Sequence, residues 1–130
     1  MSDPFTIRFP VRFRDVDVLG HVNNAVYFTY METARTEFWL HTFAGEGPQD
    51  LSFIVAHAEC DFKIPAHFGD EIEVSIRTTD IRNSSFDWVY EMRNAKNSEL
   101  LAQGKTIQVF YNHETRTSSP VPPDVRSKLL

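Results

Sequence analysis

The sequence predicts an α+β fold in which one antiparallel sheet wraps around one long apolar helix. Three observations lead to this prediction: an alternating segment near the start, an aromatic-rich stretch without Gly or Pro over 25–42, and four more strand-like segments after residue 50. We expect residues 1–130 to form one domain, because a chain of 130 residues is large enough to bury one core but not two.

The first strand is predicted over residues 5–14. Its apolar positions alternate with its arginines: Ile7, Phe9, Val11 and Phe13 against Arg8, Arg12 and Arg14. Continued alternation places Asp15 and Asp17 on the buried side, unless a bulge intervenes. Asp15 is expected to orient the end of the strand or to pair with an arginine such as Arg14 or Arg35.

A helix is predicted after this strand, from about Ala25 to Thr42. Gly20 suits the tight turn before it, and the side chains of Asn23 and Asn24 suit its N-terminal cap. Apolar and aromatic residues occupy more than one stripe of the helix, so we expect it to be broadly enclosed. The Gly45–Pro48 cluster is predicted to end the helix and to turn the chain.

The remaining segments read as antiparallel strands and a tail. Strands are predicted over 51–63, 71–79, 86–92 and 100–111, and a short surface helix within 120–130. Part of the aromatic set Phe86, Trp88 and Tyr90 is expected on an exposed outer face, which a second copy of the chain would cover.

The composition excludes several classes of function. A net charge of -5 argues against nucleic-acid binding, and no apolar run approaches the roughly 18 residues of a membrane span. The single cysteine, Cys60, forms no internal disulfide, and the first residues do not resemble a secretion signal. We therefore expect a cytoplasmic protein.

The segment from Asp17 to Asn24 is the strongest candidate for chemistry. An acid there precedes a glycine turn and the unpaired backbone N–H groups of a helix start, which can stabilise an oxyanion. Asp17 could act on a carbonyl as a nucleophile or as a general base, and the sequence leaves both open. His21 could orient water or substrate, or could simply hold the turn.

The motifs of the chain resemble those of the 4-hydroxybenzoyl-CoA thioesterase family nearly end to end. The resemblance rests on the segment 13–24, on Tyr27, on the helix segment 32–35, and on the later segments 61–65, 69–70 and 84–86. It implies a hotdog fold, a five-stranded antiparallel sheet around a central helix, as a homodimer and often as a dimer of dimers. The His21-Val-Asn-Asn24 variant resembles the broad-specificity bacterial branch.

The resemblance also implies an activity and its residues. Asp17 matches the catalytic aspartate and the backbone N–H of Asn24 the oxyanion donor, for hydrolysis of an acyl-CoA or acyl carrier protein thioester bound between subunits. No metal or redox cofactor is expected. Candidates for contact with coenzyme A phosphates are Lys63, Arg82 and Lys105. The alternative is a non-catalytic hotdog module that binds acyl-CoA or lipid.

Overall fold

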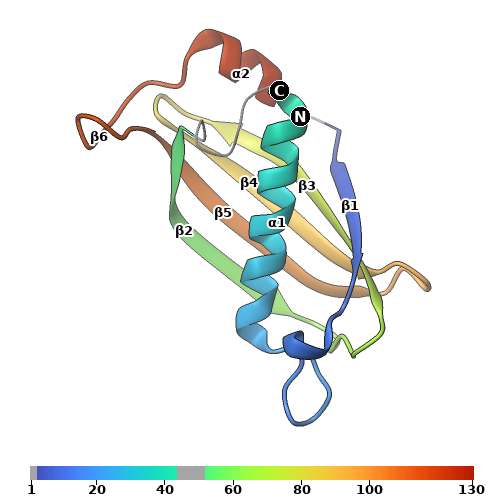
Figure 1. Ribbon diagram of the computed structural model, residues 1–130. Helices are drawn as coiled ribbons and strands as arrows, with labels where there is room; N and C mark the ends of the chain where they lie inside the picture. Colours follow the sequence, from blue (N-terminus) through green and yellow to red (C-terminus); the bar gives the residue numbers. More distant parts are fainter. Residues whose placement is uncertain (1–2, 44–51) are drawn as a thin grey trace.

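Five antiparallel strands curve around one long helix, α1 (Asn24–Thr42), in the computed structural model, which describes residues 3–43 and 52–130 (Figure 1). The strands are β1 (Phe5–Pro10), β2 (Phe53–Phe62), β3 (Glu71–Ile81), β4 (Ser85–Asn94) and β5 (Leu100–Asn112), in the sheet order β1-β3-β4-β5-β2. The predicted α+β arrangement is confirmed, and a sixth short strand, β6 (Thr117–Ser118), pairs with β5 beyond the five that were predicted. The turn predicted at Gly45–Pro48 lies outside the described residues.

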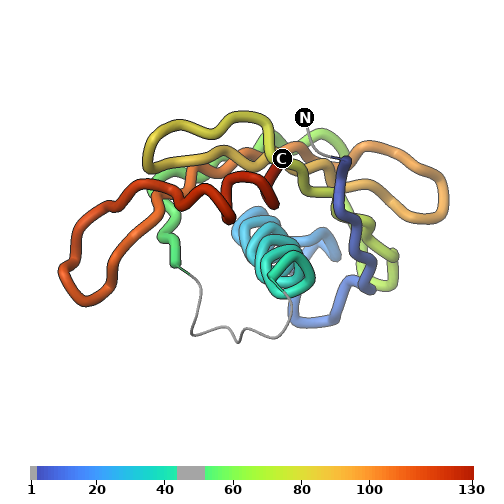
Figure 2. The backbone as a smooth tube through the Cα atoms, turned by 90° about the horizontal axis from the view of Figure 1, so that it is seen from above, coloured from blue at the N-terminus to red at the C-terminus, as the bar shows by residue number. Residues whose placement is uncertain are grey.

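Helix α1 lies in the concave side of the sheet, between the two edge strands β1 and β2 (Figure 2). Its inner side is apolar and its outer side is polar, as at the exposed Thr29, Thr33 and Glu37. The helix is therefore buried on one side only, whereas the sequence predicted that it would be broadly enclosed. Its buried residues are Tyr27, Tyr30, Met31, Ala34, Phe38 and Trp39.

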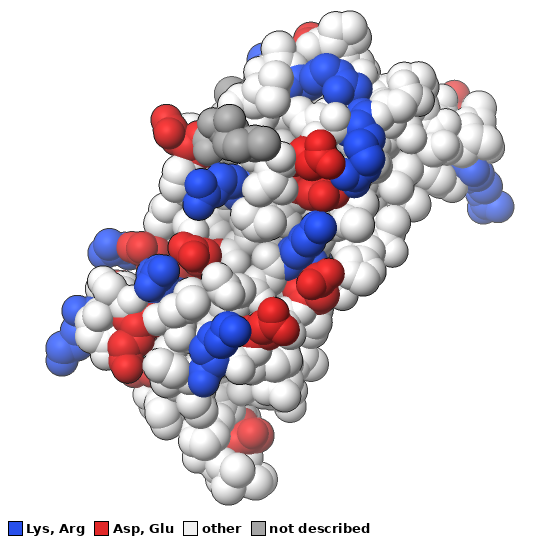
Figure 3. Space-filling view, turned by 180° about the vertical axis from the view of Figure 1, so that it is seen from behind, with Lys and Arg blue, Asp and Glu red and all other residues white. Residues whose placement is uncertain are grey.

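The aromatic residues of β4 face α1. Phe86, Trp88 and Tyr90 are each at most 1% exposed, so the prediction that they contribute to an outer face is wrong. The cause is the pleat: these side chains share the concave face, and the alternate positions of the strand point outward. Figure 3 shows that the convex face carries interspersed positive and negative side chains instead.

The first strand is shorter than predicted. β1 ends at Pro10, whose ring cannot donate to a sheet ladder, and the 3-10 turn η1 (Phe13–Asp15) follows. Phe13 is consequently 79% exposed rather than buried. The alternation does not continue to Asp15 and Asp17, so the prediction that both lie on the core side of the strand is wrong.

The C-terminal segment forms the predicted short helix. β6 (Thr117–Ser118) pairs with the end of β5, and α2 (Pro123–Leu129) follows it. Val125 and Leu129 are buried, so this helix is anchored in the core at the end of α1 opposite Asn24 (Figure 1). Neither described helix is long and apolar enough to cross a membrane.

Gly104 marks a close approach of α1 to the sheet. A Cβ atom at this position would lie 2.2 Å from the Sδ atom of the buried Met31. Gly104→Val should therefore lower the free energy of unfolding by about 1–3 kcal/mol, because the buried Met31 side chain has to leave the space that it fills. Urea denaturation measures this, with Gln103→Val as the exposed control on the same strand; equal stability of the two variants would contradict the prediction.

Candidate active site

Asp17 sits in a tight loop that its own backbone and side chain close. Its Oδ1 atom accepts hydrogen bonds from the N–H groups of Leu19 (2.9 Å) and His21 (3.3 Å), and its backbone N–H donates to the His21 carbonyl (2.8 Å). Gly20 has φ +79°, a conformation that favours glycine. The loop thus fixes one carboxylate oxygen, and the other has no hydrogen bond to a described residue.

The start of α1 lies beside this loop. Asn23 is the N-cap, and its side-chain oxygen accepts a hydrogen bond from the N–H of Ala25 at 2.9 Å. Asn24 is the first residue of the helix, so the helix itself offers no acceptor for its N–H. The predicted capping role of Asn23 is confirmed, and the Asn24 N–H is placed to meet negative charge at the positive end of the helix.

One pocket of about 190 Å³ brings the predicted residues together. It is lined by Asp17, His21, Val22, Asn24, Tyr27, Phe62, Lys63, Ile64 and Pro65. The rim is polar. The rings of Tyr27 and Phe62 pack edge to face, with their centroids 5.2 Å apart, and form an apolar wall. Phe62 and Ile64 were not predicted as site residues, since they occur at the end of an ordinary-looking strand.

The turn after β2 closes the other side of the pocket. Val22 donates its N–H to the Ala66 carbonyl at 2.8 Å, and the N–H of Ala66 donates to the Tyr27 hydroxyl at 3.3 Å. His21 packs edge to face against His67, with ring centroids 4.9 Å apart. His21 thus lines the pocket and also holds the loop, so both of its predicted roles remain compatible with the geometry.

Comparison with known proteins assigns the family. A family model described as the thioesterase-like superfamily matches residues 11–129. This chain belongs to that superfamily. A thioesterase of Thermus thermophilus, complexed with coenzyme A and Zn, superposes with a TM-score of 0.85 and 34% identity over 95% of each chain. The hotdog fold expected from the sequence is thereby confirmed.

Two sequence relatives have names that specify a substrate class. A 1,4-dihydroxy-2-naphthoyl-CoA hydrolase of Rippkaea orientalis is 28% identical over 120 residues, which span 85% of this chain and 84% of the relative. The acyl-CoA thioester hydrolase YbgC of Escherichia coli is 30% identical over 107 residues, 78% of this chain and 79% of YbgC.

Of the three cations considered for phosphate contacts in this thioesterase-like chain, Lys63 alone lines the Asp17 pocket. Arg82 and Lys105 instead pair with Asp87, at 2.5 and 3.6 Å. Burial would raise the pKa of Asp87, but the hydrogen bonds and charges of the two cations outweigh it and hold this pKa below its usual value. These two cations already have a partner that holds them.

Other side chains of the thioesterase-like fold are poor candidates for chemistry. Burial and the neighbouring Asp61 raise the pKa of Cys60 to about 11, so its thiol stays protonated at neutral pH and is a weak nucleophile. In the described part of the chain, no three His, Cys, Asp or Glu side chains are grouped to hold a metal ion. Glu32 and Arg35, one helical turn apart on α1, form an ion pair at 3.8 Å.

Asp15 connects η1 to α1 through hydrogen bonds. Its Oδ2 atom accepts hydrogen bonds from the Arg12 N–H and the Tyr30 hydroxyl, both at 2.9 Å, and its carbonyl accepts the N–H of Asn23. It thus orients the chain after β1, as one of its two predicted roles required, and its hydrogen bonds go to these groups rather than to the guanidinium of Arg14 or Arg35.

Removing the Tyr30 hydroxyl tests this connection. Tyr30→Phe should lower the free energy of unfolding by about 1–2 kcal/mol, because a partly buried carboxylate loses a donor. Chemical denaturation checks the value. Tyr111→Phe is the matched control, since that hydroxyl makes no hydrogen bond to a described residue; a Tyr30 variant as stable as the control would argue against the connection.

Proposed function

We propose that this protein is an acyl-CoA thioesterase that hydrolyses its substrate to a free acid and coenzyme A, with residues 1–130 as one catalytic domain. One observation carries the proposal: Asp17 and Asn24, at the positive start of α1, line the same pocket, which has an apolar wall. Thioester hydrolysis needs these features together. The attacking group and the oxyanion donor must both reach the carbonyl group, and an apolar surface must lie beside it to hold the acyl chain.

In the proposed reaction, the thioester oxygen accepts a hydrogen bond from the backbone N–H of Asn24. The free oxygen of Asp17 either takes a proton from the attacking water or itself attacks the carbonyl carbon to form an anhydride that water opens. In both routes the carbon–sulfur bond breaks and the thiolate of coenzyme A takes up a proton. His21, on the pocket rim, is placed to orient the water or the substrate.

The catalytic unit is proposed to be a homodimer, with two dimers forming a tetramer. Support comes from β2, an edge strand whose outer side has no neighbouring strand within the described residues. The strand carries exposed apolar residues where an edge would normally be protected: Ile54 is 40% and Val55 is 36% exposed. β2 ends at Phe62 in the Asp17 pocket, so a second copy paired along it would reach the proposed active site.

Thiol release from a panel of short, long, branched and aromatic acyl-CoAs tests the proposed function. We expect turnover of at least one class, and the ranking of kcat/KM values identifies the acyl group. The same acyl groups on acyl carrier protein test the other thioester carrier. Saturable binding without thiol release from either carrier would contradict the enzyme and favour a module that binds acyl-CoA.

A further inference from the structure

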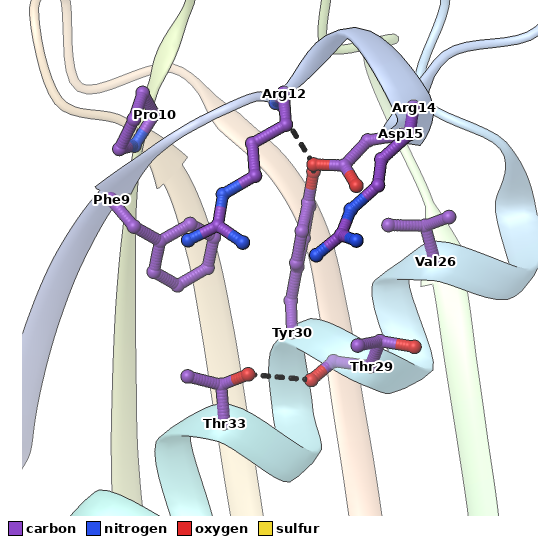
Figure 4. A pocket seen from close by; sticks show the side chains of 9 residues that line it. All are labelled: Phe9, Pro10, Arg12, Arg14, Asp15, Val26, Thr29, Tyr30 and Thr33. Atoms are coloured by element: carbon purple, nitrogen blue, oxygen red, sulfur yellow. Dashed lines mark hydrogen bonds between the residues drawn. The ribbon is translucent and has the colours of Figure 1, made fainter.

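A second pocket, of about 340 Å³, lies on the other side of the start of α1. It is formed where β1 and η1 pass over the outer side of the helix, and it shares no lining residue with the Asp17 pocket. We call it the η1 pocket and define it by Phe9, Arg12, Arg14, Thr29, Tyr30 and Thr33. Figure 4 shows the side chains of Arg12, just before η1, and of Arg14, within η1, extending toward α1 into this pocket.

The two guanidinium groups have no acceptor among the described residues. Several other arginines of the chain do: Arg8 pairs with Glu73 at 2.7 Å, and Arg82 pairs with Asp80 and Asp87. The chain has 18 acidic and 13 basic residues, so carboxylates are not scarce. Two unpaired arginines that converge on one hollow of an acidic protein therefore indicate a site for an external anion.

The one carboxylate in the η1 pocket does not neutralise both cations. Asp15 lines the pocket, but its Oδ2 atom already accepts hydrogen bonds from the Arg12 backbone and from Tyr30. Burial, and then the hydrogen bond to Asp15, raise the pKa of Tyr30, so its hydroxyl remains a donor to that carboxylate. Two guanidinium groups beside one carboxylate leave the pocket with a net positive charge.

The walls of the η1 pocket favour a ligand larger than a bare ion. The rings of Phe9 and Tyr30 lie 4.8 Å apart and provide flat apolar surface, and Thr29 and Thr33 add polar groups from the helix. A guanidinium fork matches two oxygens of a phosphate, and two forks match a dianion better than a single carboxylate. Aromatic side chains in turn give a surface for a flat ring.

We propose that the η1 pocket binds the phosphate group of a nucleotide, through the guanidinium groups of Arg12 and Arg14. The ligand has two possible sources with the same chemistry: the nucleotide end of coenzyme A, or a separate free nucleotide. The pocket is independent of the chemistry at Asp17, so binding is expected whether or not the protein turns over a thioester.

Isothermal titration calorimetry with adenosine 3′,5′-bisphosphate, and separately with inorganic phosphate, tests the site. We expect saturable binding of the nucleotide to the wild-type protein and affinity at least about 10-fold weaker in Arg12→Gln/Arg14→Gln. Glutamine keeps the backbone N–H of Arg12 that Asp15 needs, and a thermal melt verifies that the variant is folded. Arg77→Gln removes one positive charge from an exposed position on β3 and should bind like the wild type.

Three results would overturn the proposal: no saturable binding of either probe to the wild type, unchanged affinity in the double variant, or an equal loss in Arg77→Gln. Steady-state kinetics then separate the two sources. If the phosphate belongs to coenzyme A, the double variant raises KM for acyl-CoA about 10-fold with kcat unchanged, and acyl-dephospho-CoA is insensitive to the change. If KM is unchanged while nucleotide binding is lost, the ligand is a separate nucleotide.

Discussion

Replacing Asp17 by Asn should lower kcat for acyl-CoA hydrolysis by about 100- to 10,000-fold, because an amide is neither a general base nor a nucleophile. The loop should survive the change. Its two closing hydrogen bonds, from the N–H groups of Leu19 and His21, end on one side-chain oxygen, and the amide oxygen of Asn can accept both. The variant separates chemistry from folding for this reason.

The Asp17 experiment compares thiol release by the wild type, Asp17→Asn and Asp124→Asn at saturating substrate. Asp124 is an exposed acid on α2, which is neither part of β2 nor of the Asp17 pocket, so its replacement controls for the loss of one negative charge. The melting temperature and the sedimentation coefficient of each variant report on fold and assembly. Wild-type turnover by folded Asp17→Asn would rule this carboxylate out as the catalytic group.

Charging the edge strand should separate the proposed dimer. Ile54→Lys/Val55→Lys places two cations on exposed positions of β2, one on each face of the sheet, where like charges from two copies would meet. We expect monomers in sedimentation, and thiol release lower by about 100-fold, because the pocket ending at Phe62 would lose the wall that the second copy supplies.

The control for the edge strand is Leu130→Lys. Leu130 is a 65% exposed apolar residue that follows α2 and is not part of β2. This variant should remain assembled and active. A double-lysine variant that still sediments as a dimer, or a monomer with full activity, would show that β2 is not the interface that completes the site. A normal melting temperature excludes unfolding as the cause of lost activity.

Sequence periodicity predicted most of this fold, and its failures have physical causes. Alternation located β3, β4 and β5 within a few residues, since each has a buried face, whereas β2 was located by its apolar residues although only its first residue is buried. The same rule failed after Pro10, where hydrogen bonds of Asp15 favour a 3-10 turn over a continued strand. It also could not say which face of the sheet meets the helix, so Phe86, Trp88 and Tyr90 were assigned partly to the wrong side.

The candidate site was only partly readable from the sequence. The local motif located Asp17, His21 and Asn24, which the structure brings to one pocket. Phe62 and Ile64 come from the end of a distant strand, and no local pattern marks them as pocket residues. Likewise, the spacing of Arg12 and Arg14 does not show that both side chains face one pocket. The strand predicted over 5–14 would also place them on the same side, but it would not form the η1 pocket.

The manner in which Asp17 is held also bears on how substrate range could diversify. The hydrogen bonds that close its loop come from main-chain N–H groups, so the side chains at positions 18 and 19 do not position the carboxylate. Val18 and Leu19, which directly follow the acid, are 102% and 73% exposed. These two positions could vary widely, in evolution or in a laboratory library, with proline at position 19 as the main exclusion because it lacks the donor.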